Sequence, residues 1–588
     1  MIEKMTRYTF VLMSQALEGF LASIQQVGLL DITRSQKPVD EESSSLLEEI
    51  GALSSRISDI ENDRFTRDSQ YVAMTTEKAE LSKLLADAQP WGRFDADALK
   101  KLGDLGLRMR FYCVPSKKFD PAWEQAYALT IVEDNGKDCR FVTVGPTEGY
   151  EFPVAETPAP KKPCSDYSAD MEKLDARISA KVAELTAEKE TLPQLRSELA
   201  GLTDKLSLYL AGKADEKAAE GYISIVTGFA PTVQDTEVKD KLDKLGVLYM
   251  ADPAVKEDNP PIKLKNNWFA RQFESLTGMY GMPVYDEWDP TPVLAPFFLL
   301  FFALCMGDAG YGIVLTAFAY AIKGLKNGGP MGLSGHWRLL RSLGIGTFVV
   351  GIILGTFFGI DMYKAAWVPE ALKGIMLKGK VAGFDVQMVA ALGIGVVHIC
   401  LAMFIKALLY TQRFGAKHAV SVWGWVLLIV GSLATLGIGM LSGLDAEIIK
   451  YAIIGIAAVS CLAIFVFNTP GRNPLINVGA GLWDTYQMAT GLLGDVLSYI
   501  RLYALGLAGG MLGDAFNTIG GLILGQHPTW QFLPFLIVVL IGHTLNFAMS
   551  CLGAYVHPLR LTFVEYFKNS GYEGKGSKFA PFRTMTTE

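Results

Sequence analysis

Residues 492–510 read LLGDVLSYIRLYALGLAGG, an apolar run in which Arg501 is the only base. A charged side chain in the middle of a membrane helix costs at least about 2.5–3.5 kcal/mol, so it normally meets a partner or water. The nearest acid, Asp495, lies on a different face of the predicted helix. The run therefore predicts a membrane helix whose arginine meets another helix or another chain. An internal ion pair that only joins the helices is the alternative.

Two polar stripes follow the last two long apolar segments of the chain. Their residues recur at spacings of three and four, so each helix has one narrow polar and small-residue face. The first stripe consists of Asp484, Gln487, Gly491, Gly494, Ser498 and Arg501. The second consists of His543, Asn546, Ser550, Gly553, His557 and Arg560. The stripes predict an aqueous route for ions or buried hydrogen-bonded packing. His398, inside another apolar segment, either lines such a route or is a buried histidine with its hydrogen bonds satisfied. Asp308 is expected to cap a turn or a helix.

Six apolar segments are long enough to cross a membrane. They cover residues 339–360, 386–411, 419–442, 449–468, 477–524 and 531–567. The last two are too long for one perpendicular crossing, so they should tilt, kink or project from the bilayer. A further run, from Pro292 to Lys323, is broken by GDAGYG at 307–312. This run crosses either once or twice.

Basic residues favour two crossings. The loop after the broken run is flanked by Lys323, Lys326, Arg338 and Arg341. Positive loops stay in the cytoplasm, where the charged residues before the run are also expected. Both conditions hold only if the run crosses twice, which predicts about eight spans with both termini inside. Three later bases agree, namely Arg413, Lys417 and Arg472, whereas four lysines within 361–385 weakly disagree. The alternative is one long helix and seven spans.

Charge divides the 588 residues into two unlike halves. Residues 1–292 hold 49 acidic and 35 basic side chains, whereas residues 293–568 hold 10 and 16. The net charges are therefore −14 and +6. This split excludes one uniform soluble globule, and the long apolar runs exclude a disordered chain. The first twenty residues lack the uninterrupted apolar core of a signal peptide, so the N-terminal half is expected in the cytoplasm.

The N-terminal half contains two heptad patterns that predict a long helical hairpin. The first pattern places apolar residues at Leu46, Ile50, Leu53, Ile57 and Ile60. The second runs from Met171 to Leu206 and contains Pro193, which argues for a break or kink. The arms, 41–88 and 169–219, pair as an antiparallel coiled coil or form two ordinary amphipathic helices of a bundle.

Short β-rich segments predict a lobe at each end of this hairpin. One lobe combines residues 1–40 with 221–255, and the distal lobe covers 89–165. The expected fold is therefore mainly α. Cytoplasmic α/β lobes and a long coiled-coil arm occupy 1–292. A bundle of about eight transmembrane helices, two of them long and tilted, occupies 293–568, and a cytoplasmic tail occupies 569–588.

No catalytic, cofactor or metal site is predicted. The GKGS at Gly574 lacks the spacing and the preceding strand of a phosphate loop. The six His all follow residue 335 and show no metal-ligand spacing, and the seven Cys are too scattered for a disulfide scaffold. No nucleic-acid partner is expected.

The run at 492–510 resembles the signature of the large membrane stator subunit of rotary V/A-type ATPases, called subunit I or subunit a. Four further stretches share the resemblance. They are DPTPVLAPFFLLFFALCMGDAGYG (289–312), IGVVH (394–398), GHTLNFAMSCLGAYVHPLRLTFVEYF (542–567) and KFAPF (578–582). The compact chain is more similar to bacterial and archaeal members than to organellar ones.

The resemblance implies a role for each striped residue. An arginine at the position of Arg501 faces a rotating ring of small subunits and favours their ionised carboxylates. Arg560 matches the second arginine of the family, and the other residues of its stripe would line the aqueous route. Ser550 stands where family members often have a Glu. Further candidates are Asp484, Gln487, Asp495, Ser498 and His398.

The resemblance also implies partners. They are ring proteolipid subunits, peripheral stalk subunits, an ATP-hydrolysing head reached through the stalks, and membrane lipid. The chain would be a non-catalytic, multi-pass protein of the cell inner membrane that carries H⁺ or Na⁺. A secondary ion transporter with a cytoplasmic helical regulatory domain is the runner-up, but only one Gly-interrupted segment is visible and it has no counterpart. A membrane-anchored scaffold would leave two intramembrane arginines without a purpose.

Overall fold

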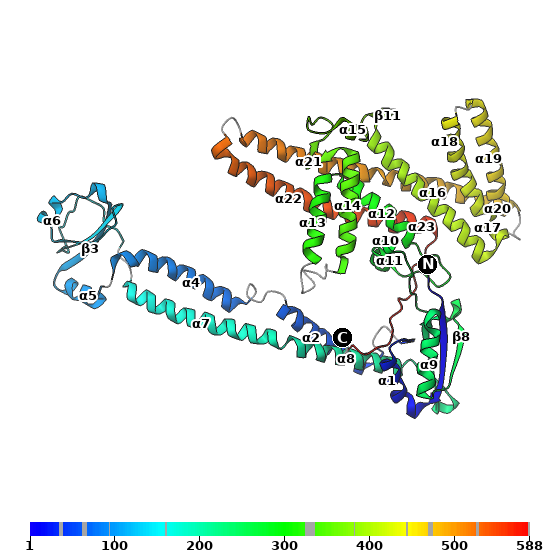
Figure 1. Ribbon diagram of the computed structural model, residues 1–588, viewed down its shortest axis with the longest axis horizontal. Helices are drawn as coiled ribbons and strands as arrows, with labels where there is room; N and C mark the ends of the chain where they lie inside the picture. The colour runs from blue at the N-terminus through cyan, green and yellow to red at the C-terminus, as the bar shows by residue number, and fades with distance from the viewer. Residues whose placement is uncertain are drawn as a thin grey trace. The chain divides into compact units, whose positions relative to one another are not determined.

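The structure is a computed structural model dominated by helices (Figure 1). It describes the whole chain except residues 35–38, 62–67, 93, 159–161, 324–334, 382, 443–444, 468–473, 525–527 and 586–588. Lys326 and Arg472, used above for the orientation, lie outside the described residues. Contacts divide the chain into two compact units. The first unit comprises Met1–Leu12, Leu29–Thr33 and Ala218–Pro581, and the second comprises Met13–Gly28, Arg34–Lys217 and Phe582–Glu588.

A small sheet opens the first unit. Its strands lie in the order β2 (Asp31–Ile32), β7 (Ile223–Pro231), β1 (Met5–Met13) and β8 (Tyr249–Pro253). β1 pairs antiparallel with β8, and β2 pairs antiparallel with β7. The strand near residue 221 therefore joins the opening strands, although almost 200 residues separate them. Helix α9 (Asp235–Leu245) contacts β7, and the hydroxyl of Tyr8 on β1 donates to the Asp235 carboxylate at the start of α9.

Paired helices form most of the second unit. Helix α2 (Glu41–Glu61) packs along α8 (Leu192–Gly212), and α4 (Ser69–Ala88) packs along α7 (Cys164–Glu190). Where α2 meets α8, Ile57 and Ile60 pack against Leu195. The second arm breaks between Glu190 and Leu192, beside Pro193, as predicted. Winding of the paired helices as a coiled coil stays a prediction.

The second unit also holds a helix at one end of the arm and a sheet at the other. Helix α1 (Leu17–Val27) packs on α8 and ends at Gly28, which has a left-handed backbone. The distal sheet is antiparallel, in the order β3 (Leu107–Pro115), β5 (Asp138–Pro146) and β4 (Leu129–Asp134). These three strands coincide with the β-rich segments that the sequence predicts.

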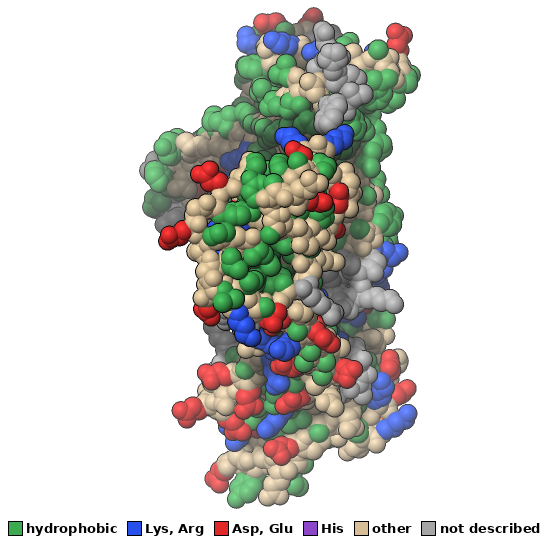
Figure 2. Space-filling model, turned by 90° about the vertical axis from the view of Figure 1, so that its left-hand side faces the viewer, with side chains coloured by type: hydrophobic (Ala, Val, Ile, Leu, Met, Phe, Trp, Pro, Cys, Tyr) green, Lys and Arg blue, Asp and Glu red, His purple; other side chains and the backbone are tan. Residues whose placement is uncertain are grey.

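Six helical segments of the described chain are long and apolar enough to cross a membrane. They are Trp337–Leu354, Val386–Phe414, Ala416–Gly439, Ala446–Val466, Ile476–Leu524 and Gln531–Ser570. These segments match the six predicted ones. On the face that Figure 2 draws, hydrophobic side chains gather in broad areas, and Lys, Arg, Asp and Glu side chains gather in others.

The broken run forms two shorter apolar helices, α12 (Thr291–Met306) and α13 (Ala309–Lys323). The chain breaks at Gly307, whose φ is +63°. Helix α13 packs tightly against α14 (Trp337–Leu354), because glycines let the two backbones approach (Figure 1). A Cβ at Gly351 would lie 2.3 Å from the backbone nitrogen of Ala309. The sequence therefore located the break correctly, and the count of eight spans stays a prediction.

Three long helices build the remainder of the ion-handling region that the sequence predicts. Helix α20 (Pro474–Ser498) gives way at Tyr499 to α21 (Ile500–Leu524), and α22 (Pro528–Arg560) lies beside α21 (Figure 1). After α22 the chain widens into a π-helical turn, Leu561–Tyr566, before the short α23 (Phe567–Ser570). These breaks divide the two segments that are too long for one straight crossing.

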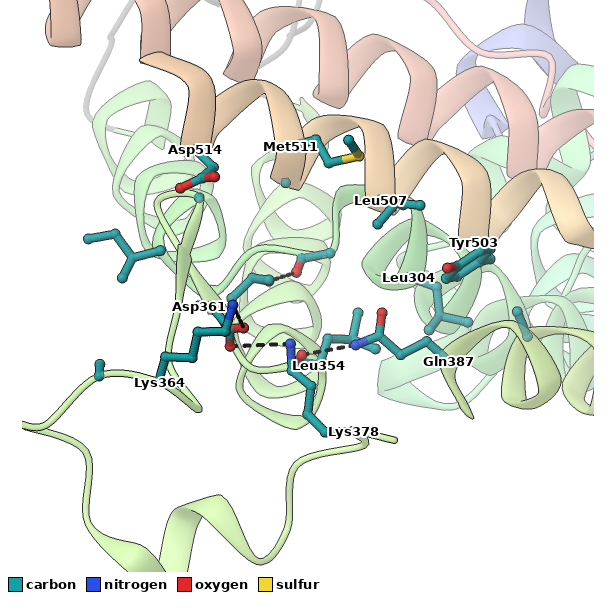
Figure 3. Close-up of a pocket in the computed structure, with 18 residues that line it drawn as sticks. Leu304, Leu354, Asp361, Lys364, Lys378, Gln387, Tyr503, Leu507, Met511 and Asp514 are labelled. Atoms are coloured by element: carbon teal, nitrogen blue, oxygen red, sulfur yellow. Dashed lines mark hydrogen bonds and ion pairs between the residues drawn. The ribbon is translucent and has the colours of Figure 1, made fainter. Parts of the chain in front are cut away.

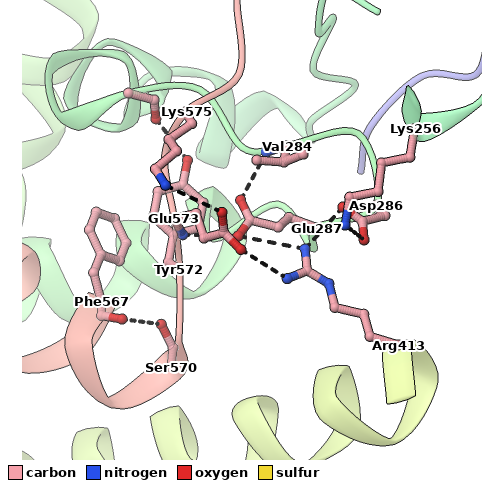
Figure 4. A network of polar contacts seen from close by, with 11 residues as sticks. Lys256, Val284, Asp286, Glu287, Arg413, Phe567, Ser570, Tyr572, Glu573 and Lys575 are labelled. Carbon is pink, nitrogen blue, oxygen red and sulfur yellow. Dashed lines mark hydrogen bonds and ion pairs between the residues drawn. The ribbon is translucent and has the colours of Figure 1, made fainter. Parts of the chain in front are cut away.

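The other candidate spans are α16 (Val386–Phe414), the segment that α17 (Ala416–Val426) and α18 (Ser432–Ser442) form across a π-helical turn, and α19 (Ala446–Val466). Near the end of α16, Arg413 meets three carboxylates (Figure 4). Its Nη2 lies 3.0 Å from Asp286 Oδ1 and 3.7 Å from Glu287 Oε1, and its Nη1 lies 3.4 Å from Glu573 Oε1. We call these four residues the Arg413 cluster. It ties α16 both to the segment before α12 and to the C-terminal tail.

Candidate functional site

Arg501 occupies the first turn of α21, directly after the interruption at Tyr499. Its side chain is half-buried, and its Nη1 is buried without a hydrogen-bond partner among the described residues. Helix α12 lies against the same stretch of α21, since a Cβ at Gly506 would lie 2.5 Å from the carbonyl oxygen of Leu304. The small residues after Arg501 thus let a neighbouring helix approach closely.

His557 and Arg560 lie near the end of α22, and His557 lies within electrostatic range of Arg501. Both arginines interact electrostatically with the His557 ring. His557 is half-buried, and its Nδ1 has no hydrogen-bond partner within the described chain. Arg560 is exposed. Two permanent positive charges therefore act on one histidine, and neither arginine forms an ion pair with an acid among the described residues.

The other half of the α22 stripe is a closed hydrogen-bond network. His543 Nδ1 lies 2.8 Å from the hydroxyl of Tyr311 on α13, and its Nε2 lies 2.9 Å from Asn517 Oδ1 on α21. Asn546, 1% exposed, donates to the Tyr311 hydroxyl and to the carbonyl of Gly509. Ser550 donates to Asn546 at 3.3 Å. These contacts join three helices, which is the packing role that the sequence left open.

Asp308 fixes the break between α12 and α13. Its carboxylate is 1% exposed and accepts from four backbone N–H groups. Oδ1 accepts from Gly310, Tyr311 and Phe358, and Oδ2 accepts from Gly359. Asp308 is therefore the expected helix cap, and it also holds a loop fifty residues further along the chain. That second function has no signal in the local sequence.

His398 is fully buried within aromatic side chains on α16. Its Nδ1 lies 2.9 Å from the Tyr499 hydroxyl, and its ring stacks on Tyr566 with centroids 4.6 Å apart. Its Nε2 has no partner among the described residues. The ring packs beside the break between α20 and α21, and it lines neither of the two cavities described next.

The first of two polar cavities, the α20 cavity, has a volume of about 370 Å³. Its polar lining residues are Lys406, Ser421, Asp484, Gln487, Asp495, Lys568 and Asn569. Asn569 donates to Asp495 at 2.8 Å, and Lys568 Nζ lies 3.6 Å from the same carboxylate. The predicted candidates Asp484, Gln487 and Asp495 therefore share one cavity, which two lysines from other helices make electrically mixed.

Glu565 continues this polar path and was missed by the sequence reasoning. It belongs to the π-helical turn after α22, is 2% exposed, and lies near the Ser498 hydroxyl, which donates to the Gly494 carbonyl. Its Oε2 has no partner among the residues that the structure describes. Asp495 and Arg560 both interact with it electrostatically. An acid inside the apolar run 561–567 was the only signal that could have identified it.

The second polar cavity, the α21 cavity, has a volume of about 530 Å³ (Figure 3). Tyr503, Gly506, Gly510 and Asp514 of α21 line one side. Asp361, Lys364, Lys378 and Gln387 line the other, where Lys378 Nζ lies 3.2 Å from Asp361. Figure 3 shows these charged side chains pointing into the space below α21.

Along the successive helices α20 and α21, Arg501 lies between the residues that line the two cavities. Asp495 lines one cavity and Tyr503 lines the other, eight residues further on. At a rise of 1.5 Å per residue, these two linings are roughly 12 Å apart along the axis.

Comparisons with known proteins match a short stretch of the chain with a family model and larger shares of it with individual relatives. Residues 216–327 match the model of the V-type ATPase 116kDa subunit family. The A-type ATP synthase subunit I of Methanocaldococcus jannaschii is 32% identical over 371 residues, which are 59% of this chain and 52% of that protein. The V-type ATP synthase subunit I 1 of Treponema pallidum is 26% identical over 560 residues, 87% of this chain and 86% of that protein.

A third relative, the V-type ATP synthase subunit I of Borreliella burgdorferi, is 24% identical over 84% of this chain and 82% of that protein. The alignment thus spans about half of the archaeal relative and most of the two spirochaete ones. With six candidate spans, these relatives identify the chain as a multi-pass membrane protein.

Proposed function

We propose, from the premise that this chain belongs to the subunit I family of V/A-type ATPases, that it is the membrane stator of a rotary complex. It moves H⁺ or Na⁺ together with a ring of proteolipid subunits, each of which carries a carboxylate. ATP chemistry takes place on other subunits, so the chain itself is not an enzyme.

The placement of Arg501 between two polar cavities is the observation that carries the proposal. An arginine beside a ring carboxylate favours the ionised form, so each arriving carboxylate releases its ion. Arginine keeps its proton at any physiological pH and cannot itself relay one. The fixed charge therefore separates the two cavities electrically while the ring carries ions past it.

The α20 and α21 cavities are the two half-channels in this proposal. On one side, ions pass Asp484, Gln487 and Asp495 and then the Ser498–Glu565 pair. On the other side, they pass Asp361 and Asp514 below Tyr503. The unpartnered Oε2 of Glu565 supports its role as the last acid before the arginines.

The orientation of the chain in the membrane places the termini and the helical arm in this proposal. The cavity containing Lys568 lies beside the C-terminal tail, which is cytoplasmic if the basic loops are. We place both termini in the cytoplasm, the bundle of about eight helices in the cell inner membrane, and the helical arm as a coiled coil against peripheral stalks. The arm then prevents the ATP-hydrolysing head from turning with the ring.

The variant Arg501→Ala tests the proposal. The purified complex should assemble and hydrolyse ATP at least partly, yet vesicles that contain it should show no ATP-driven ion uptake. Lys450→Ala removes an exposed positive charge outside both cavities and should pump normally. Normal pumping by Arg501→Ala would refute the role of Arg501.

Purification of the native complex separates the stator from the transporter alternative. Recovery of nucleotide-binding subunits and a ring proteolipid with this chain supports the stator. A homo-oligomer of this chain alone would support a secondary transporter.

A further inference from the structure

A cluster of cations surrounds Trp337 at one end of the α13–α14 hairpin. Lys323 Nζ lies 4.8 Å from the Trp337 ring centroid, and the guanidinium carbons of Arg338 and Arg341 lie 5.7 Å and 5.2 Å from it. No acid among the described residues forms an ion pair with these three bases. Cation–π contacts with Trp337 hold the three positive charges near one another, although like charges repel. A bound anion would relieve this repulsion, so the cluster suits an anionic ligand.

A pocket of about 320 Å³ opens beside this cluster. It lies between α14 and the short helices α10 (Trp268–Arg271) and α11 (Glu274–Tyr280), and its polar and aromatic lining is Trp268, Arg271, Gln272, Ser275, His336 and Arg338. Its lining within the described residues contains two arginines and no acid. The hydroxyl oxygen of Ser275 is buried there without a hydrogen-bond partner in the described chain. The pocket thus offers charged and neutral donors to one ligand.

An apolar face continues from the same end of the hairpin. Arg338, Arg341, Ile345 and Val349 follow one face of α14 at spacings of three and four, with both bases at one end. Ile345 and Val349 are about half exposed, as are Ile313 and Phe318 on the neighbouring α13. This pattern fits a molecule with an anionic head and long apolar chains.

We propose that the pocket and the Trp337 cluster bind the phosphate headgroup of an anionic phospholipid, with its acyl chains along α13 and α14. Arginine pairs with phosphate oxygens through parallel N–H bonds, and Trp is favoured at the membrane–water interface. A lipid fits better than free phosphate because the apolar face is continuous with the bases. The leaflet is cytoplasmic, which rests on the orientation given under the proposed function.

Native mass spectrometry of the delipidated complex tests this site. The probes are dioctanoyl phosphatidylglycerol, dioctanoyl phosphatidylcholine and glycerol phosphate. Wild type should bind phosphatidylglycerol, whose headgroup is anionic, more tightly than phosphatidylcholine. The double variant Arg271→Gln, Arg338→Gln should bind it at least about tenfold more weakly, because glutamine can replace each charge-assisted hydrogen bond only by a weaker neutral one. The control Lys380→Gln, Lys450→Gln removes two exposed charges elsewhere and should bind like wild type.

Three results would overturn the proposal. They are equal binding of the two lipids, unchanged binding by the arginine double variant, and glycerol phosphate binding as tight as that of the lipid. The last result would identify a site for free phosphate instead.

The Arg501→Ala variant separates this proposal from the stator function. It should bind phosphatidylglycerol like wild type while it fails to pump. Normal pumping by Arg501→Ala together with selective lipid binding would refute the stator role alone. If wild type binds phosphatidylglycerol and phosphatidylcholine equally, while pumping still depends on Arg501, the lipid site alone would be refuted.

Discussion

Arg501 and Arg413, two arginines of the apolar half of the chain, differ in what they contact. Arg413 is neutralised by three carboxylates, whereas one nitrogen of Arg501 is buried and unpartnered within the described chain. A buried charge without a partner is costly, so its persistence favours a partner outside this chain. In the proposed function, a carboxylate of the ring would be that partner.

Glu565 is expected to be needed for transport. Glu565→Gln keeps the shape of the side chain but cannot release a proton or hold an ion by charge. Vesicles with this variant should pump ions severalfold more slowly, while the complex still hydrolyses ATP. Glu447→Gln, an exposed acid at the start of α19, is the matched control. Equal pumping rates in the two variants would remove Glu565 from the route.

Asn546 is expected to contribute stability through its network. Asn546→Ala leaves the Tyr311 hydroxyl and the Gly509 carbonyl without their donor, at about 1–3 kcal/mol for each buried group. The thermal unfolding midpoint of the detergent-solubilised complex should fall. Thr544→Ala, whose exposed hydroxyl bonds only to its own helix, should leave the midpoint unchanged. A similar fall in both variants would count against the network.

At the scale of elements, helix breaks decide which side chains meet. The π-helical turn Leu561–Tyr566 holds more residues than an α-helical turn. Side chains after Arg560 therefore no longer recur on the face of the α22 stripe at spacings of three and four. Glu565 then faces Ser498, although it follows Arg560 by five residues rather than by three or four. The break at Tyr499 similarly starts a new helix just before Arg501.

The α13–α14 contact is expected to tolerate no side chain at Gly351. A methyl group there would lie 2.3 Å from the backbone nitrogen of Ala309, and a backbone cannot move aside as a flexible side chain can. Gly351→Ala should lower the amount of folded complex in membranes, measured by immunoblot and thermal melting. Gly437→Ala on α18 meets open space and should be neutral or slightly stabilising. A neutral Gly351→Ala would show that the helices can separate.

At the scale of the whole molecule, the Arg413 cluster connects the membrane helices to the segment before α12. Burial tends to raise the pKa of Asp286, but the hydrogen bond from Lys256 and the charge of Arg413 outweigh it, so the pKa lies below its ordinary value. A lowered folded-state pKa stabilises the protein above the ordinary carboxyl pKa of about 4, and this stabilisation is lost as the pH falls through the lowered value.

Asp286→Asn should therefore destabilise the complex at neutral pH and matter less in acid. The difference in thermal midpoint from wild type should stay constant down to about pH 5 and shrink below about pH 4. Glu237→Gln, which breaks an exposed pair with Lys241 on α9, should change the midpoint little at any pH. A difference for Asp286→Asn that persists at about pH 3 would contradict the assigned pKa direction.

Local patterns in the sequence determined the six apolar segments, the break at GDAGYG and the distal strands. They did so because helical and strand periodicity repeat over a few residues and leave a direct trace. Only the tertiary structure divided the α22 stripe, since Tyr311 and Asn517 satisfy His543 while nothing described satisfies His557 Nδ1. It alone brought Glu565 to Ser498 and Asp308 to the 358–359 loop. Such meetings depend on how distant helices pack, which no short-range period encodes.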